Sequence, residues 1–161
     1  MLRNLLVLLT SSLRTRVAAD STLTCSFRVM PWDVGISTFK SDRYFAVAES
    51  AQADFLVRTG LFRSMLTGRM RWVKLGQAAR MERPLRIFQG FEVTTRVVCI
   101  DEKHAYFSHR FSSPGGQHAE VLVKVKFKHG RMTLPPRQVL GPQSQEKVPG
   151  ILAMDQMLSH T

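Results

Sequence analysis

Residues 42–59 predict a helix whose apolar side chains point in nearly every direction. Ser41 and Asp42 are residue types that cap a helix, and Gly60 stands where helices commonly end. Apolar residues occupy positions 45, 47, 48, 51, 55, 56 and 57, around most of the circumference. A helix of this kind is buried on several sides. The rest of the fold must therefore wrap around it.

The second half of the chain alternates apolar and polar residues with a period of two, which is typical of β-strands. Strands are predicted over residues 71–79, 91–100, 104–111 and 117–128, and an earlier strand over residues 24–30. Alternate residues from Phe91 to Cys99 are predicted to share one face. Because short turns join the last three strands, they form an antiparallel meander. A strongly curved sheet can cover a lone buried helix, which predicts an α+β fold.

The chain of 161 residues has the usual length of one domain. We divide it into an N-terminal basic amphipathic segment at residues 1–23, one domain at residues 24–130, and an extended C-terminal tail at residues 131–161. A short helix is expected over Leu61–Leu66. Proline and glycine recur in the tail, where only a last helical turn near Leu152–Leu158 is predicted.

The N-terminal segment allows three interpretations. Residues 1–19 contain three arginines, no acidic residue and a short apolar run, Leu5–Leu9. The segment is expected to be a retained amphipathic helix on the domain or on a membrane surface. A mitochondrial transit peptide and a signal peptide stay open as alternatives. The expected location is the cytoplasm, with peripheral membrane contact and mitochondrial targeting left open.

Basic residues outnumber acidic ones by 23 to 12, which gives a formal net charge of +11. Such a field attracts anions: nucleic acid, anionic lipid, or a phosphorylated ligand such as coenzyme A. Aromatic residues do not alternate with basic ones in a stacking pattern, so nucleic-acid binding rests on net charge alone. Neither cysteine, Cys25 or Cys99, has metal-ligand or CxxC spacing, and both are expected to be small buried side chains. No metal site is predicted.

Two ordered blocks of residues resemble a known family. The first contains Met30-Pro31-Trp32-Asp33, Ser41-Asp42-Arg43-Tyr44 and the stretch from Glu49 to Leu61. The second runs from Arg83 to Val98 and on to Arg110-Phe111. Together they resemble the 4-hydroxybenzoyl-CoA thioesterase-like hotdog proteins, in particular the thioesterase superfamily member 6-like branch. The resemblance implies a hotdog fold, in which a curved antiparallel sheet wraps around one long central helix, and a homodimer formed by pairing sheets.

The resemblance also implies where chemistry occurs. Hotdog thioesterases of this kind place the thioester carbonyl at the amino end of the central helix, where free N–H groups and the helix dipole stabilise an oxyanion. The amides from Lys40 to Arg43 are the expected donors, and the Thr38 and Ser41 hydroxyls are candidates to orient a water. Gly35 stands where the family has its second acid, and residues 37–41 replace its His-Asn-Asn segment.

Three carboxylates are candidates for the nucleophile or general base. Asp33 is the first choice, with a turn residue that bonds local amides as the alternative. Asp42 lies at the helix start, where a cap is the expected role. Glu49 lies in a mostly apolar helix, where a structural pair with an arginine is the alternative to catalysis.

A cluster of basic side chains is expected to receive the phosphates of coenzyme A at a dimer edge. It consists of Arg63, Arg69, Arg71 and Lys74. The predicted function is an acyl-CoA thioesterase that needs no cofactor beyond the coenzyme A of its substrate. The alternative is a non-catalytic hotdog protein that binds acyl-CoA or lipid at a membrane surface.

Overall fold

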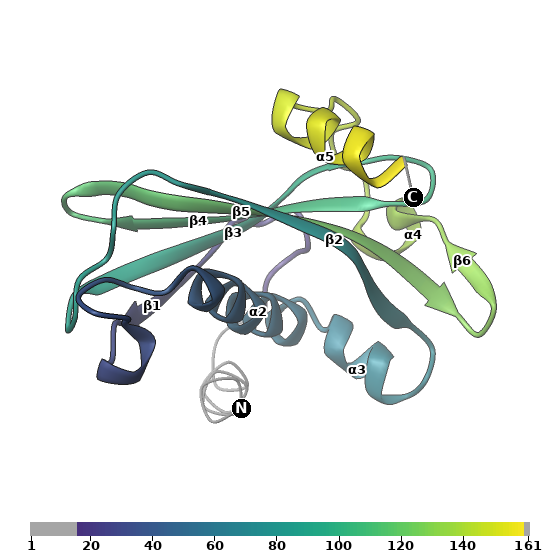
Figure 1. Ribbon diagram of the computed structural model, residues 1–161. Coiled ribbons are helices and arrows are strands. Elements are labelled where there is room, and N and C mark those ends of the chain that lie inside the picture. Colours follow the sequence, from purple (N-terminus) through teal and green to yellow (C-terminus); the bar gives the residue numbers. More distant parts are fainter. Residues whose placement is uncertain (1–15, 160–161) are drawn as a thin grey trace.

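A six-stranded antiparallel sheet curves around one long helix, α2 (Ser41–Arg58), in the computed structural model, which describes residues 16–159 (Figure 1). Five strands follow the order β1-β3-β4-β5-β2, and β6 pairs with β5. The strands are β1 (Leu23–Arg28), β2 (Arg71–Met81), β3 (Gly90–Ile100), β4 (Ala105–Ser113), β5 (Gly116–His129) and β6 (Met132–Leu134). The remaining elements are η1 (Pro31–Asp33), α3 (Leu61–Leu66), α4 (Pro136–Leu140) and α5 (Pro149–Ser159). The predicted α+β architecture is confirmed.

The main core lies between α2 and the inner face of the sheet. Tyr44, Val47 and Phe55 of α2 are almost fully buried there. Inward-facing residues of the sheet complete the core, and they include Val93, Phe107, Phe111, Val121, Val123, Val125 and Phe127. Each large apolar side chain buried in this way contributes about 1.5–3 kcal/mol. The buried residues of β5 alternate with a period of two, because one face of the strand is covered by the helix.

A β-bulge in β3 reverses the side of the sheet on which Cys99 lies. Val97 pairs with Phe107 and Cys99 pairs with Tyr106, so Val98 is an extra residue in the ladder. Cys99 therefore packs on the outer face, beside Tyr106. The prediction that Cys99 shares a face with Phe91 is wrong, because one inserted residue shifts the alternation.

The residues after 130 form β6, α4 and α5, so the tail is not extended as predicted, although the helical turn predicted near Leu152–Leu158 lies within α5. Figure 1 shows α5 on the face of the sheet opposite to α2. Ile151 and Met154 of α5 are buried against Cys99 and Tyr106 in a second, smaller core. Pro149 opens the helix, at a position where its missing N–H and fixed φ cost nothing.

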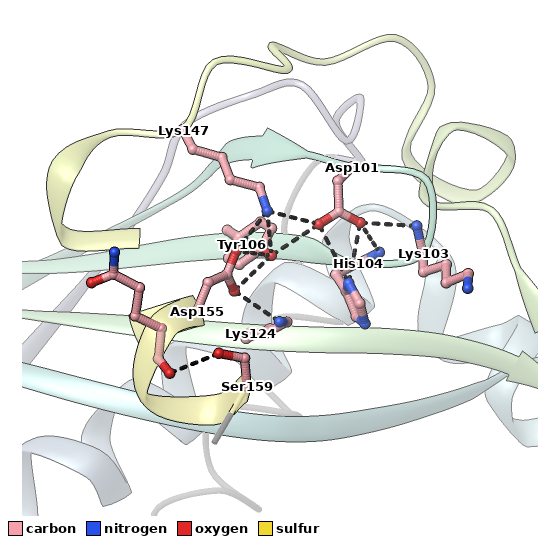
Figure 2. Close-up of polar contacts among 9 residues, drawn as sticks. Asp101, Lys103, His104, Tyr106, Lys124, Lys147, Asp155 and Ser159 are labelled. Carbon is pink, nitrogen blue, oxygen red and sulfur yellow. Dashed lines mark hydrogen bonds and ion pairs between the residues drawn. The ribbon is translucent and has the colours of Figure 1, made fainter. Parts of the chain in front are cut away.

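A polar network, called here the α5 cluster, joins α5 to the outer face of the sheet (Figure 2). It consists of Asp101, Tyr106, Lys124, Lys147 and Asp155. The Lys147 ammonium donates to Asp155 Oδ2 at 2.6 Å and lies 3.1 Å from Asp101 Oδ2. The Tyr106 hydroxyl lies 2.9 Å from carboxylate oxygens of both acids, and Lys124 Nζ donates to Asp155 Oδ1 at 2.8 Å. Two carboxylates therefore face two ammonium groups across the strand–helix contact.

Hydrogen bonding outweighs burial in setting the protonation of the α5 cluster. Burial raises the pKa of Asp101, but N–H donors from Lys103 and His104 and the Lys147 ammonium hold it well below its usual range. Burial also acts against the charge of Lys147, yet its bonds to Asp155, Tyr106 and Asp101 raise its pKa. Bonds to Lys124, Lys147 and Tyr106 likewise lower the pKa of Asp155, so Asp101, Asp155 and Lys147 keep their charge near neutral pH.

The predicted amphipathic helix at residues 1–19 falls mostly outside the described residues, since the description starts at residue 16. The boundaries of the predicted N-terminal segment stay a prediction. Within residues 16–159, no helix combines the length and apolar character needed to cross a bilayer.

Candidate active site

A short loop positions the amino end of α2. Val34 and Phe39 form an antiparallel bridge, and Thr38 pairs in the same way with Arg86. The Phe39 N–H donates to the Leu85 carbonyl at 3.0 Å. The loop is thus held between η1 and the segment that enters β3. The predicted loop is present, but two bridges order it.

Aromatic side chains form the floor beneath this end of the helix. The Phe39 and Tyr44 rings meet edge to face with centroids 4.8 Å apart, and Tyr44 meets Phe111 at 5.2 Å. Phe91 lies 5.8 Å from Phe39 and 5.9 Å from Phe111. Burial raises the pKa of the Tyr44 phenol, so it stays protonated and cannot serve as a base at neutral pH. This floor is a closed, apolar part of the main core.

The amino end of α2 has no side-chain cap. Lys40 is the N-cap, and no side chain there accepts an N–H. The expectation that Ser41 or Asp42 caps the helix is wrong, because both already lie inside its first turn. The Lys40 N–H donates to the Asp33 carbonyl, and the Arg43 N–H donates to the Lys40 carbonyl. Within the described chain the Ser41 and Asp42 amides have no acceptor, as helix geometry dictates for a first turn.

Asp33 lies beside the site but is turned into its own loop. The residue is fully buried, and its Oδ2 accepts the Met30 N–H at 3.1 Å across η1. Its backbone carbonyl accepts from Lys40. This geometry matches the alternative role of Asp33, a turn residue whose carboxylate bonds local amides.

The other two carboxylates differ in position. The Asp42 side chain is 72% exposed, in the same turn as the two available amides, with Arg43 Nε 3.7 Å away. Glu49 lies two turns further along the helix, and it is half exposed and paired with Lys74 at 2.5 Å. A structural ion pair was expected for Glu49, but the partner is a lysine of β2. Asp42 is therefore the solvent-accessible carboxylate nearest to the free amides.

The predicted phosphate cluster lies toward the other end of α2. Arg63 is in α3, which directly follows the helix; Arg69 lies just before β2, and Arg71 is the first residue of that strand. Because α2 has 18 residues, it is roughly 27 Å long. Lys74 is engaged by Glu49 and by the Gln77 side chain. Within one subunit, Arg63, Arg69 and Arg71 therefore do not meet Thr38, Lys40 and Ser41.

A buried histidine on the inner face was missed by sequence reasoning. His109 of β4 is fully buried, and its Nδ1 lies 2.9 Å from the Thr95 hydroxyl. Its Nε2 has no partner among the described residues. Burial, together with the nearby Lys74, lowers the pKa of His109 to about 3, so the ring is neutral. The signal available in the sequence is a histidine and a threonine at alternating positions of two neighbouring predicted strands.

A second cluster was also missed. A cavity of about 590 Å³, called here the loop pocket, lies where the β2–β3 connection meets the β4–β5 turn. It is lined by Arg83, Pro84, Arg86, Gln89, Gly90, Ser113, Pro114, Gly115 and His118. The available signal was the pair of arginines in the Arg83–Arg86 stretch.

Neither cysteine takes part in the site. Cys25 and Cys99 are buried and unlinked. Burial raises the pKa of Cys99 to about 11, so its thiol stays protonated. In the part of the chain that the structure describes, no three His, Cys, Asp or Glu side chains gather in a metal-binding group.

A curved sheet around a central helix with an uncapped amino end defines a hotdog domain of the thioesterase type. The chain belongs to the thioesterase-like superfamily, whose family model matches residues 26–138. A curated relative is Protein THEM6 of Xenopus laevis, with 33% identity over 84 residues. That match covers 52% of this chain and 41% of the relative, so the chain spans less than half of that protein's length.

Solved structures share the fold at low sequence identity. The probable thioesterase YbaW of Escherichia coli aligns with a TM-score of 0.68 and 17% identity, over 74% of this chain and 96% of that one. The Staphylococcus aureus hypothetical protein SAV2348, solved in complex with CoA, aligns with a TM-score of 0.67 and 12% identity, over 83% and 92% of the two chains. The predicted hotdog fold and family are confirmed.

Proposed function

We propose that this protein hydrolyses an acyl-CoA thioester at the amino end of α2. The observation that carries the proposal is the first turn of α2, where the Ser41 and Asp42 amides lack an acceptor within the described chain. Such amides, at the positive end of an 18-residue helix, stabilise the negative charge that develops on a carbonyl oxygen. Beneath this turn the protein interior is apolar, since the buried rings of Phe39, Tyr44 and Phe111 pack there.

The proposed step is addition of water to the thioester carbonyl. A carboxylate accepts a proton from the water while the new C–O bond forms, and the carbonyl electrons move to the oxygen held by the two amides. The C–S bond then breaks, the carbonyl re-forms, and the thiolate of coenzyme A takes up the proton. Asp42 is the carboxylate best placed to act as base, since it is exposed in the same turn.

A non-catalytic acyl-CoA or lipid binder is the second candidate. The observation that favours it is Asp33, the first-choice catalytic residue, which is buried and bonded to the Met30 amide. If Asp42 serves only to complement the helix dipole, the site retains a carbonyl-binding end and an apolar floor but has no base. Binding without turnover is then the expected behaviour.

The test is thiol release from a panel of acyl-CoAs, short-chain, long-chain and aromatic. Asp33→Asn, Asp42→Asn and Glu49→Gln variants are compared with the wild type. Loss of about 100-fold or more in turnover is expected for Asp42→Asn, the range for removing a general base. Glu49→Gln is the control, because it removes a carboxylate of the same helix at a distance from the free amides. Measurable acyl-CoA binding without hydrolysis of any acyl-CoA in the panel would contradict the thioesterase proposal and favour the non-catalytic binder.

A further inference from the structure

We propose that the loop pocket binds a phosphate group of the coenzyme A part of the substrate, through Arg83 and Arg86. This inference rests on the proposed acyl-CoA ligand and assigns its phosphates to a different site from the cluster at Arg63, Arg69, Arg71 and Lys74. The pocket, and not that cluster, lies at the amino end of α2 within the same subunit.

The charge of the pocket is unbalanced. Two guanidinium groups line it, and its lining includes no acidic residue. Within residues 16–159, no carboxylate lies within ion-pair distance of Arg83 or Arg86, whereas Arg80, Arg110 and Lys124 of the sheet each have a carboxylate partner. Guanidinium groups without a carboxylate partner bind phosphate oxygens through paired N–H donors.

Hydrogen bonds fix the walls of the pocket before any ligand arrives. The Ser113 hydroxyl lies 2.7 Å from Nε2 of the buried His118, whose Nδ1 lies 3.3 Å from the Arg83 carbonyl. One Arg83 N–H donates to the Gly115 carbonyl at 2.8 Å, which leaves the other guanidinium donors for a ligand. The Arg86 amide donates to the Gln89 side chain at 2.9 Å. The β2–β3 connection and the β4–β5 turn are thereby joined into one rigid rim.

The pocket and the proposed oxyanion site are held together by backbone pairing. Thr38 pairs with Arg86, and the Phe39 N–H donates to the Leu85 carbonyl. Ser41 is three positions after Thr38, so their Cα atoms are at most about 11 Å apart. The pantetheine arm of coenzyme A separates its phosphates from the sulfur, so one ligand can place the thioester at α2 and a phosphate in the pocket.

Binding of coenzyme A, dephospho-CoA and pantetheine to the full chain tests this inference. Arg86→Met is the first variant, because the Arg86 side chain makes no described hydrogen bond whose loss would disturb folding. We expect it to weaken coenzyme A binding about tenfold, the effect of losing one charge-assisted phosphate contact. Arg83→Met adds a similar loss, and pantetheine, which has no phosphate, binds all variants equally. Arg131→Met is the charge-matched control and leaves binding near the wild-type value.

Several results would overturn the inference. One is equal weakening by Arg131→Met, which would indicate the general positive field and not a site. Another is undiminished coenzyme A binding in the Arg83→Met/Arg86→Met double variant, with weakening by Arg69→Met/Arg71→Met instead. Absence of coenzyme A binding by the wild-type protein would also exclude it. So would a result in which the Arg83 and Arg86 variants weaken binding to phosphatidic acid vesicles but not to coenzyme A. Pocket-dependent binding without hydrolysis would leave the inference intact and remove only the enzymatic proposal.

Discussion

His109 shows how a single residue couples the folded state to pH. Its ring is enclosed between the sheet and α2, with Thr95 as its one described partner. Burial lowers its pKa to about 3, from an ordinary value of 6.5. Between these two values the unfolded chain binds a proton that the folded chain does not. The free energy of unfolding therefore decreases progressively as pH falls below about 6.5.

We expect the His109→Asn variant to have a flatter dependence of unfolding free energy on pH than the wild type. The difference in slope between pH 6 and pH 4 is about 1.4 kcal/mol per pH unit, the effect of one proton. Asparagine keeps a group able to bond Thr95 but does not titrate. Chemical denaturation at each pH measures the slope. The exposed His129→Asn is the control, and equal slopes in all three proteins would contradict the assignment.

At the residue scale, the sequence located groups better than it assigned their roles. Asp33, Asp42 and Glu49 were recognisable as carboxylates around a helix start, and Asp42 does lie in the first turn. Whether a carboxylate points into solvent, into its own turn or toward Lys74 depends on contacts from distant segments. The pattern of one segment carries no information about such contacts.

At the scale of elements, the hydrophobic periodicity and the positions of glycine and proline predicted most of the fold. Gly60 ends α2 with a φ of 78°, a conformation that glycine adopts without steric cost. The limits of α3 were predicted to the residue. The inserted Val98 was not predicted, because a bulge leaves the alternation locally plausible. Only the later part of α5 was predicted, because the helix begins with a Pro-Gly pair that also marks loops.

The attachment of α5 to the sheet can be measured through Cys99, which lies beneath it. In a Cys25→Ser background, we expect Lys147→Met to increase the rate of thiol labelling of Cys99 about tenfold. The substitution leaves two carboxylates without their shared ammonium group, and a loss of about 1–2 kcal/mol in docking free energy gives a change of this size. A labelling reagent with absorbance readout, used at pH 8, measures the rate.

A matched control is Lys103→Met, which removes a lysine side chain that forms no ion pair within the described chain. Its labelling rate should equal that of the background protein. If Lys147→Met labels no faster than this control, the second core of Ile151 and Met154 holds α5 in place without the α5 cluster.

At the scale of the whole molecule, β1 and β2 are the two ends of the strand order, and β2 is the longer of these edge strands. Among the described strands it pairs with β5 alone, along one of its two edges. An unpaired edge strand readily accepts another strand. We expect the homodimer implied by the hotdog resemblance to form along this edge, where Leu75 is 41% exposed.

Leu75→Pro tests this arrangement. The ladder with β5 passes from Lys74 to Gly76, so Leu75 is the extra residue of a bulge. Proline at a bulge costs the monomer little, but it disrupts an added strand. Sedimentation should show a dimer for the wild type and a monomer for the variant, with unchanged circular dichroism. A variant that remains dimeric would place the subunit contact elsewhere.

The position of α5 also limits how such dimers can assemble further. Two sheets that stack face to face lie about 10 Å apart, which leaves no room for a helix between them. Here α5 lies on the outer face, anchored by Ile151, Met154 and Asp155. Stacking of two outer faces would require both helices to leave their sheets and expose two apolar surfaces. While α5 stays docked, it therefore blocks stacking through this face of the sheet.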